Sequence, residues 1–334
     1  MLIYCLKALV IGYGSVGSRH IQNLSLISNI EIVVQTNRKM NTFLKKNNCK
    51  LIKTINTAIK EKPDFAIIST ETNSHLKIAT KLAQNNIPFL LEKPLSHTLN
   101  GLDKLLKTVK EKKLITLMGC PLRFHPSLKK IKQLLEQKKL GKIYSVYSEN
   151  GSFLPDWHSK EDYRKSYAAR KELGGGVLLT NIHEIDYLYW FFGKIRKVSA
   201  MSGKISNLVL NVEDYALIHL DFFNKMVANV HLDFFQISKS RKLKIIGEKG
   251  ILTCDLTNNE VMLYTTKKSK WIVVSKPTFD LNKIYVDELN HFIQCLQNHE
   301  TTKNPITIGA EVLKTVFLIK KSVREKRMIN YDEL

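Results

Sequence analysis

Short apolar runs alternate with amphipathic segments over the first part of the chain. The apolar runs lack the polar alternation of a half-exposed strand, so they predict strands covered on both faces of a sheet. Strands and helices that follow each other at this spacing predict a doubly wound parallel sheet over residues 1–120. The predicted strands are residues 7–11, 31–34, 63–70, 87–91 and 114–118, and helices are predicted through residue 26, through residue 84 and over residues 102–112.

The pattern changes after residue 120, where a helix is followed by strand-like runs separated by short turns. Consecutive strands joined in this way predict a large, mostly antiparallel open sheet. The runs are residues 143–147, 198–201, 215–223, 226–235, 242–246, 250–256, 261–265 and 271–274, with helices over residues 128–137, 286–298 and 308–325. We therefore predict an α/β domain over residues 1–120 and an α+β domain over residues 121–334.

Length and composition fit two ordinary globular domains. The chain has 334 residues, of which 44% are hydrophobic and 25% charged. No apolar run approaches the roughly 20 residues that span a bilayer, and the apolar start of the chain resembles the approach to a strand, not a signal peptide. Five scattered cysteines predict free thiols in the cytoplasm, and the sequence contains no zinc-binding motif.

The formal charge of +22 raises the question of nucleic-acid binding. However, the lysines occur as scattered pairs, and no basic helix, arginine-rich tail or aromatic-interleaved stripe concentrates them. We therefore expect no nucleic-acid partner. Attraction of small anionic molecules is the milder consequence of this charge.

A glycine-rich turn lies between the first predicted strand and the first predicted helix. It reads G-x-G-x-x-G in the position that gives this motif its meaning as a dinucleotide-binding fingerprint. Gly12 permits the tight turn, Gly14 lets backbone approach a pyrophosphate, and Gly17 lets helix and strand pack closely. Free N–H groups and the helix dipole then hold the anion. The residues of the motif are Gly12, Tyr13, Gly14, Ser15, Val16 and Gly17.

The end of the second strand carries no acid to grip the adenosine ribose of NAD. Thr36, Asn37 and Arg38 stand there instead, and they can donate hydrogen bonds to a 2′-phosphate that a carboxylate would repel. The sequence thus favours NADP over NAD. The alternative is that Arg38 is a solvated loop residue and either cofactor is used.

Another apolar strand ends abruptly in Glu92, Lys93 and Pro94. The carboxyl ends of parallel strands are where open α/β sheets bind ligands, and Pro94 ends strand pairing because it lacks an N–H group. Lys93 is therefore expected on stiff backbone facing a crevice, although a lone lysine at a strand end is usually only a surface residue.

The second domain contains a triple glycine, residues 174–176, followed by a segment predicted to be helical. This helix carries Asn181, His183 and Asp186 among apolar neighbours. Positions 183 and 186 share a helix face, so Asp186 can orient His183. A histidine among aromatic residues is, however, often a satisfied core residue.

Taken together, four motifs resemble the Gfo/Idh/MocA oxidoreductases, the family of glucose–fructose oxidoreductase and inositol dehydrogenase. They are Gly12-x-Gly14-x-x-Gly17, Glu92-Lys93-Pro94, Arg123-Phe124-His125-Pro126 and the triple glycine ahead of His183-x-x-Asp186. The resemblance implies an N-terminal Rossmann domain and a C-terminal domain whose open sheet mediates homodimers or homotetramers. It also implies NAD(P)-dependent hydride transfer to or from sugars, polyols or nucleotide sugars.

The resemblance implies roles for individual residues as well. Lys93 matches the family's catalytic lysine, Glu92 the acid beside the nicotinamide ribose, and His183 the proton-transferring histidine. The other implied residues are Ser69, Thr70, His75 and Arg123 near the cofactor, and Trp157, Tyr163, Arg164 and Thr180 facing the substrate.

The sequence departs from the family at one position that concerns the chemistry. Family members commonly carry an aspartate four residues before the histidine, where this chain has Leu179, and the neighbouring Thr180 and Asn181 cannot act as a base. The compact H-E-x-D form resembles a subgroup associated with bacterial surface-sugar biosynthesis.

These residue types fit hydride transfer at a carbon that bears oxygen. A histidine titrates near neutrality and suits proton transfer, and a lysine stabilises a developing alkoxide. We expect His183 to be the acid/base, Lys93 its electrostatic partner, and Asp186 or Asn181 the orienting group. The alternative is a dinucleotide- or sugar-sensing regulator that uses the same scaffold without catalysis.

Overall fold

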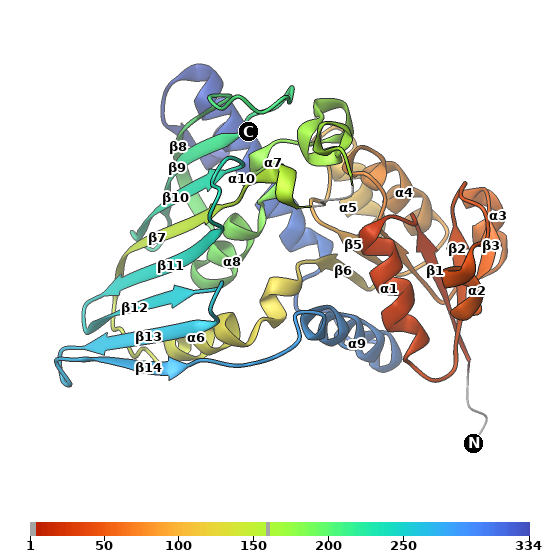
Figure 1. Cartoon of the computed structure of the whole chain (residues 1–334), viewed down its shortest axis with the longest axis horizontal. Coiled ribbons are helices and arrows are strands. Elements are labelled where there is room, and N and C mark those ends of the chain that lie inside the picture. The colour runs from red at the N-terminus through yellow and green to blue at the C-terminus, as the bar shows by residue number, and fades with distance from the viewer. Residues whose placement is uncertain (1–4, 158–160) are drawn as a thin grey trace. The chain divides into compact units, whose positions relative to one another are not determined.

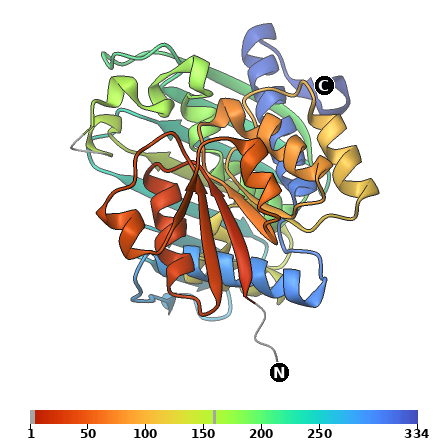
Figure 2. The ribbon, with the colours of Figure 1, turned by 90° about the vertical axis from the view of Figure 1, so that its right-hand side faces the viewer.

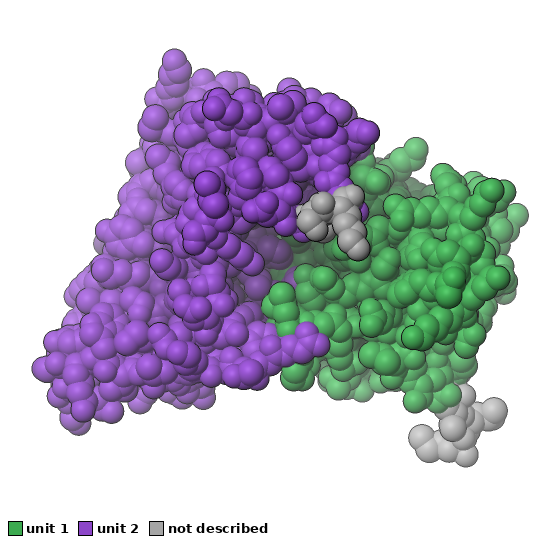
Figure 3. Space-filling model, viewed as in Figure 1, with its two compact units in different colours: residues 1–120, 281–310 green, residues 121–280, 311–334 purple. Residues whose placement is uncertain are grey.

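The chain forms two compact units (Figure 3). The computed structural model describes residues 5–157 and 161–334. One unit comprises Met1–Cys120 with Leu281–Ala310, and the other Pro121–Asp280 with Glu311–Leu334. The predicted division at residue 120 lies at a boundary between the units, whereas residues 281–310, which the sequence assigned to the second domain, belong to the first unit.

A six-stranded sheet forms the first unit, in the strand order β3-β2-β1-β4-β5-β6. All neighbouring strands are parallel, which confirms the doubly wound sheet, and helices lie on both of its faces (Figure 2). The strands are β1 (Leu6–Ile11), β2 (Ile30–Gln35), β3 (Lys50–Ile52), β4 (Phe65–Ile68), β5 (Phe89–Glu92) and β6 (Thr116–Gly119). The helices are α1 (Ser15–Ser25), α2 (Thr42–Lys46), α3 (Ile55–Lys60), α4 (Thr72–Gln84), α5 (Leu102–Glu111) and α9 (Lys283–Asn298).

Helices α1 and α9 share one face of this sheet. Leu24 of α1 and Phe292 of α9 lie in one core cluster with strand residues such as Phe65. The rings of Phe65 and Phe292 meet edge to face, with 5.7 Å between their centroids. Helix α9 therefore belongs to the first unit because it covers apolar strand residues that water would otherwise reach. Its sequence shows an apolar face but not which sheet that face covers.

The second unit is built on a nine-stranded sheet, in the order β14-β13-β12-β11-β7-β10-β9-β8-β15 (Figure 1). Neighbours are antiparallel except β7 and β10, which pair in parallel, so the prediction of a mostly antiparallel sheet is confirmed. The strands are β7 (Ile143–Gly151), β8 (Ile195–Gly203), β9 (Tyr215–Phe222), β10 (Val227–Asp233), β11 (Ser240–Gly247), β12 (Gly250–Asp255), β13 (Glu260–Thr265), β14 (Trp271–Ser275) and β15 (Ile329–Asn330). The short 3-10 turn η1 (Pro121–Phe124) is followed by the helices α6 (Pro126–Glu136), α7 (Val177–Thr180) and α8 (His183–Phe192). Helix α10 (Ile306–Glu325) begins in the first unit and lies mostly in the second.

One face of the nine-stranded sheet contacts α6, α7 and α8. The opposite face carries a shallow groove of about 700 Å³. Three of its apolar side chains, Tyr147, Met201 and Leu217, are 49%, 66% and 45% exposed. They lie on β7, β8 and β9, and Met201 and Leu217 are direct cross-strand neighbours. Apolar residues thus gather on the uncovered face of this sheet.

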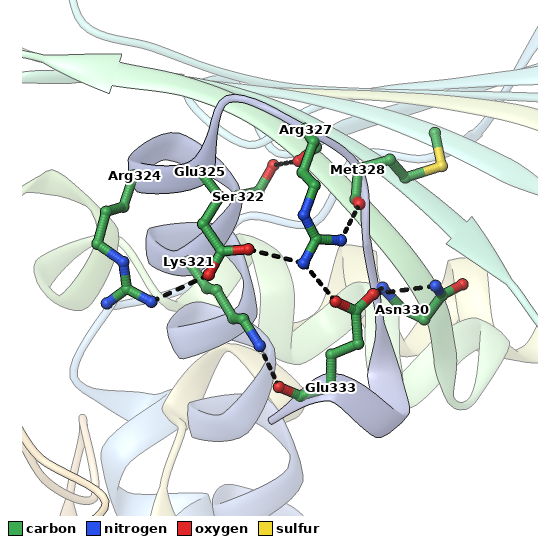
Figure 4. A network of polar contacts seen from close by, with 8 residues as sticks. All are labelled: Lys321, Ser322, Arg324, Glu325, Arg327, Met328, Asn330 and Glu333. Carbon is green, nitrogen blue, oxygen red and sulfur yellow. Dashed lines mark hydrogen bonds and ion pairs between the residues drawn. The ribbon is translucent and has the colours of Figure 1, made fainter.

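A network of polar contacts fastens the C-terminal segment (Figure 4). Arg327 donates to Glu325 at 2.7 Å and to Glu333 at 2.5 Å, and the amide of Asn330 donates to the same Glu333 at 2.8 Å. The hydrogen bond from Arg327, supported by Asn330, lowers the pKa of Glu333 to about 2. These contacts hold β15 where it pairs with β8.

Two features of the second unit differ from the sequence prediction. The helix expected to carry both Asn181 and His183 is two helices, because the chain breaks between α7 and α8 at residues 181–182. Strands β7 and β10 pair in parallel, which the long connection over residues 152–226, with its two further strands, permits. In the described part of the chain, no helix is both long and apolar enough to cross a membrane.

Candidate active site

The turn between β1 and α1 has the geometry of an anion cradle. Gly12 adopts a φ of +98°, and a Cβ there would lie 2.7 Å from the carbonyl oxygen of Ser69. A Cβ at Gly17 would lie 2.3 Å from the carbonyl oxygen of Gly12, so only glycine permits this approach of helix to strand. At Gly14, in contrast, a Cβ would meet nothing within 4 Å.

Helix α1 begins beside that open space without a cap of its own. Its N-cap residue, Gly14, supplies no side-chain hydrogen bond, and the first turn contains no acidic residue. The N–H groups of the first turn therefore lack a side-chain acceptor at the cap and have no carboxylate beside them. Open space and helix N-terminus together fit the pyrophosphate of a dinucleotide.

The next strand end supports the same turn from the side. The hydroxyl of Ser69 donates to the carbonyl oxygens of Ile11 and Gly12, both at 3.2 Å. The hydroxyl of Thr70 accepts a hydrogen bond from Ser74 at 2.7 Å. Both predicted residues thus lie in the loop after β4, and Ser69 acts on the glycine turn itself.

The end of β2 presents hydrogen-bond donors and one cation. The Arg38 guanidinium lies 5.7 Å from the centroid of the Tyr13 ring, and its backbone N–H donates to the hydroxyl of Thr36 at 3.2 Å. Asn41 holds the hydroxyl of Tyr13. Asn37, Arg38 and the neighbouring residues 39–42 are exposed, so this rim is open to a ligand.

Strand β5 delivers Glu92 and Lys93 at the carboxyl edge of the sheet. The Glu92 side chain is 10% exposed, and its Oε1 lies 2.7 Å from Nε2 of His20 in α1. On the other side stands Gly119 of β6, where a Cβ would lie 3.0 Å from the Glu92 carboxyl carbon. The carboxylate is therefore held between a helix and a strand, directly before Lys93.

His75, predicted to lie near the cofactor, is a buried residue of α4. Its side chain is 1% exposed, and its two ring nitrogens lie 2.8 Å from the carbonyl oxygen of Pro94 and 2.9 Å from that of Thr70. Both nitrogens are thus engaged with protein backbone. His75 therefore joins the loops that follow β4 and β5, and its place beside the cofactor stays a prediction.

Arg123 and Asp186, both predicted site residues, form a buried ion pair in the second unit. Arg123, expected near the cofactor, is 6% exposed and makes two hydrogen bonds to Asp186, from Nε at 2.8 Å and from Nη2 at 2.7 Å. Asp186, expected to orient His183, therefore accepts from Arg123 with both carboxylate oxygens. This bidentate pair holds α8 against η1, immediately beyond β6.

Helix α8 is anchored at two further points that sequence reasoning did not identify. The fully buried Glu184 accepts from Arg241 of β11 at 2.7 Å and from Asn150 of β7 at 3.3 Å. The hydroxyl of Tyr187 lies 2.6 Å from that of Ser148, and burial raises the pKa of Tyr187 above its usual range. These anchors fix the helix that begins with His183.

Asn181 lies in the break between α7 and α8. Its side chain is 5% exposed, yet its amide nitrogen meets no hydrogen-bond acceptor within residues 5–157 and 161–334. A buried donor without an acceptor costs free energy unless a ligand satisfies it. Thr180, one residue before, is also buried.

The other residues predicted to face a substrate lie on the segment before the triple glycine. The indole N–H of Trp157 donates to the hydroxyl of Ser152 at 2.9 Å, and the hydroxyl of Tyr163 accepts from the amide of Val209 at 3.0 Å. The guanidinium of Arg164 lies 2.8 Å from the carboxylate of Asp162, and this hydrogen bond lowers the pKa of Asp162. The side chain of Arg164 is 58% exposed. His158, which adjoins Trp157, lies outside the described residues.

Comparison with known families covers both units of the chain. Residues 6–120 match the model "Oxidoreductase family, NAD-binding Rossmann fold". Residues 128–253 match the model "GFO/IDH/MocA C-terminal domain".

Curated relatives share low identity over long alignments. The myo-inositol 2-dehydrogenase of Thermotoga maritima is 22% identical, over 97% of this chain and 98% of its own. The scyllo-inositol 2-dehydrogenase (NAD⁺) of Bacillus subtilis is 25% identical, over 75% of this chain and 73% of its own. The 2,7-anhydro-N-acetylneuraminate hydratase of Escherichia coli is 22% identical, over 79% of this chain and 72% of its own.

Solved structures share the fold over almost the whole chain. Levoglucosan dehydrogenase in complex with NADH has a TM-score of 0.89 at 16% identity, over 98% of this chain and 99% of its own. GenD2 from gentamicin A biosynthesis, in complex with NAD, has a TM-score of 0.84 at 19% identity, over 99% of this chain and 97% of its own. With the glycine turn, the Glu92-Lys93 strand end and the two matched domains in place, the chain belongs to the Gfo/Idh/MocA family of oxidoreductases.

Proposed function

We propose that this protein is an NAD(P)-dependent oxidoreductase that acts on a hydroxyl-bearing carbon of a sugar, polyol or nucleotide sugar. The observation that supports it most is the open cradle at Gly14, beside an uncapped helix N-terminus whose first turn contains no acidic residue. The two inositol dehydrogenases among the relatives and levoglucosan dehydrogenase among the structural neighbours support this substrate class.

The bound nicotinamide would supply the hydride acceptor or donor. Lys93, at the carboxyl end of β5, would stabilise negative charge developing on the substrate oxygen. His183, at the first turn of the anchored helix α8, would exchange the hydroxyl proton. The buried amide of Asn181 would hold a substrate oxygen or orient His183, since Asp186 is engaged with Arg123.

For the cofactor itself we propose a preference for NADP. Thr36, Asn37 and Arg38 offer donors and a cation at the end of β2, where an NAD-specific site would carry an acid. The two structural neighbours described above contain NAD or NADH, so Arg38→Ala is the informative variant. We expect it to weaken NADPH binding at least about tenfold more than NADH binding.

The test is a panel of inositols, sugars and nucleotide sugars, each incubated with NAD or NADP and followed by absorbance of the reduced nicotinamide. Because one relative is a hydratase, mass spectrometry of the products should accompany the absorbance, so that a reaction without net redox change is seen. Turnover of any member supports the proposal. Tight dinucleotide binding without any reaction would favour the sensing regulator instead.

We also propose that two copies of the chain pair through the open face of the nine-stranded sheet. The exposed Tyr147, Met201 and Leu217 and the groove of about 700 Å³ support this, because exposed apolar patches mark association surfaces. A dimer, or a tetramer of two such dimers, would cover them.

A further inference from the structure

The buried contact between His20 and Glu92 takes no part in the proposed hydride and proton transfer. His20 is fully buried in α1, one turn after Gly17. Its Nε2 lies 2.7 Å from Oε1 of Glu92, a residue 72 positions further along the chain. Both residues lie in the first unit.

The surroundings of His20 determine which of its two ring nitrogens carries the proton. Its other nitrogen, Nδ1, is buried and has no partner in the described part of the chain. A proton on Nδ1 would be a buried donor without an acceptor, which costs more than a bare lone pair. We therefore assign the proton to Nε2, which donates to the Glu92 carboxylate in a charge-assisted hydrogen bond.

Neighbouring residues restrict the position of the Glu92 carboxylate. A Cβ at Gly119 would lie 3.1 Å from Oε2, so β6 limits the carboxylate on that side. Tyr285 of α9 lies close enough that burial first, and the Glu92 charge second, raise its pKa to about 12. The guanidinium of Arg19 lies 4.3 Å from the centroid of the same tyrosine ring.

In the described part of the chain, one oxygen of Glu92 is engaged in a hydrogen bond. Oε1 faces His20, while Oε2 has no hydrogen-bond partner among residues 5–157 and 161–334. Glu92 directly precedes Lys93, at the sheet edge where α/β folds bind their ligands. A hydrogen bond that fixes one oxygen thereby fixes the direction in which the other faces.

We propose that His20 is a positioning residue that holds the Glu92 carboxylate so that Oε2 accepts a hydrogen bond from a ribose hydroxyl of the bound dinucleotide. This inference rests on the proposed dinucleotide-dependent function, and it assigns His20 a role in cofactor affinity, not in the chemical step. Preorganising the acceptor lowers the entropic cost of binding.

The experiment measures the NADH and NADPH dissociation constants of the full chain by nicotinamide fluorescence, without turnover. His20→Leu removes the donor and is expected to weaken the tighter-binding dinucleotide about 10-fold to 100-fold, the usual effect of a hydrogen bond to a charged group. His20→Gln is the rescue variant, because its amide nitrogen is as many bonds from Cα as Nε2 of histidine. It should bind within about threefold of wild type.

A double-mutant cycle separates this role from general packing. In a Glu92→Ala background, His20→Leu should not weaken binding further, because the carboxylate it positions is gone. Gln22→Leu, an exposed change on the same helix, is the control and should leave affinity unchanged. If His20→Leu fails to fold, His20→Asn, whose amide is too short to reach Glu92, replaces it with the same expectation.

The outcomes are distinguishable. A wild-type protein that binds neither dinucleotide overturns the proposed function and this inference with it. If the wild type binds and His20→Leu (or His20→Asn in its place) binds equally well, the inference alone fails. It also fails if glutamine gives no rescue, or if the effects of His20 and Glu92 are additive.

Discussion

Lys93 and His183 lie in different units of the chain, and each was proposed from a short sequence motif. Lys93 follows a buried strand, and the residue before it is held by His20 across the sheet edge. His183 opens a helix that three polar contacts attach to its own unit, through Asp186, Glu184 and Tyr187. In each case a short motif identifies the functional residue, whereas the residues that fix its position are distant in the sequence.

At this scale we predict that Lys93→Ala and His183→Ala each lower kcat at least about 100-fold. Dissociation constants for NADH and NADPH should change by less than about threefold, because neither side chain is proposed to bind the pyrophosphate. Steady-state kinetics with the substrate found in the panel, together with fluorescence titration, measure both quantities. Lys77→Ala, an exposed lysine of α4, is the matched control, and wild-type turnover in either test variant would refute the assignment.

At the scale of elements, the six-residue motif at the junction of β1 and α1 contains a glycine that the fold requires and one that only ligand binding requires. Gly17 is required by packing, because a Cβ there would lie 2.3 Å from the Gly12 carbonyl oxygen, whereas a Cβ at Gly14 would enter open space. Gly14 has φ −93° and ψ −161°, an extended conformation open to any residue. Its small size therefore serves a ligand and not the fold.

We accordingly predict opposite effects of two alanine substitutions. Gly14→Ala should change the free energy of unfolding by less than about 0.5 kcal/mol, yet weaken dinucleotide binding at least about tenfold by filling the cradle. Gly17→Ala should cost about 1–3 kcal/mol of stability through overpacking. Denaturant titration and fluorescence binding measure the two, and unchanged affinity in a folded Gly14→Ala protein would contradict the placement of the pyrophosphate.

Strand β10 supplies a pH-dependent contact on the second unit. His231 Nε2 lies 2.9 Å from a carboxylate oxygen of the buried Asp233, and this hydrogen bond raises the pKa of His231. A raised folded-state pKa contributes stability below the unfolded value of about 6.5, and that contribution is lost as the pH rises through the folded pKa. The side chain is 40% exposed, so solvent screens the effect.

We predict that an NMR titration will place the pKa of the His231 ring above that of an unstructured peptide. Asp233→Asn should move it back down, because the neutral amide no longer favours the charged ring. A titration midpoint unchanged by this substitution would show that Asp233 is not the cause.

At the scale of the whole molecule, the nine-stranded sheet has one face covered by its own helices and one that is not. The uncovered face carries Tyr147, Met201 and Leu217 beside polar residues, a composition suited to association in water. An isologous dimer would bring the same patch of two copies together.

We predict that the wild-type protein sediments as a dimer or larger assembly at micromolar concentration. Leu217→Arg should shift it to monomer, because a charge would be buried against its symmetry mate. Leu26→Arg, an equally drastic change at a leucine that is 74% exposed in the first unit, should leave the assembly intact. A wild type that is monomeric throughout would rule out this surface as the interface.

Much of the fold was predictable from the sequence. Runs such as residues 87–91 were long and apolar enough to predict buried strands, whereas β3, α2 and α3 were missed because they are short and lack such runs. The parallel pairing of β7 with β10 and the placement of α9 in the first unit were also out of reach. Strand and helix formation depends on residues close in sequence, but which surfaces meet depends on the packing of the whole unit.

For the candidate site, the sequence alone determined the glycine turn, the Glu92-Lys93 strand end and the segment around His183, because each depends on neighbouring residues. The tertiary structure decided which partner each buried carboxylate has. It gave Glu92 to His20, Asp186 to Arg123 and Glu184 to Arg241, across 72, 63 and 57 positions of chain. A buried charge must find a partner wherever the fold brings one near, and no local pattern encodes that choice.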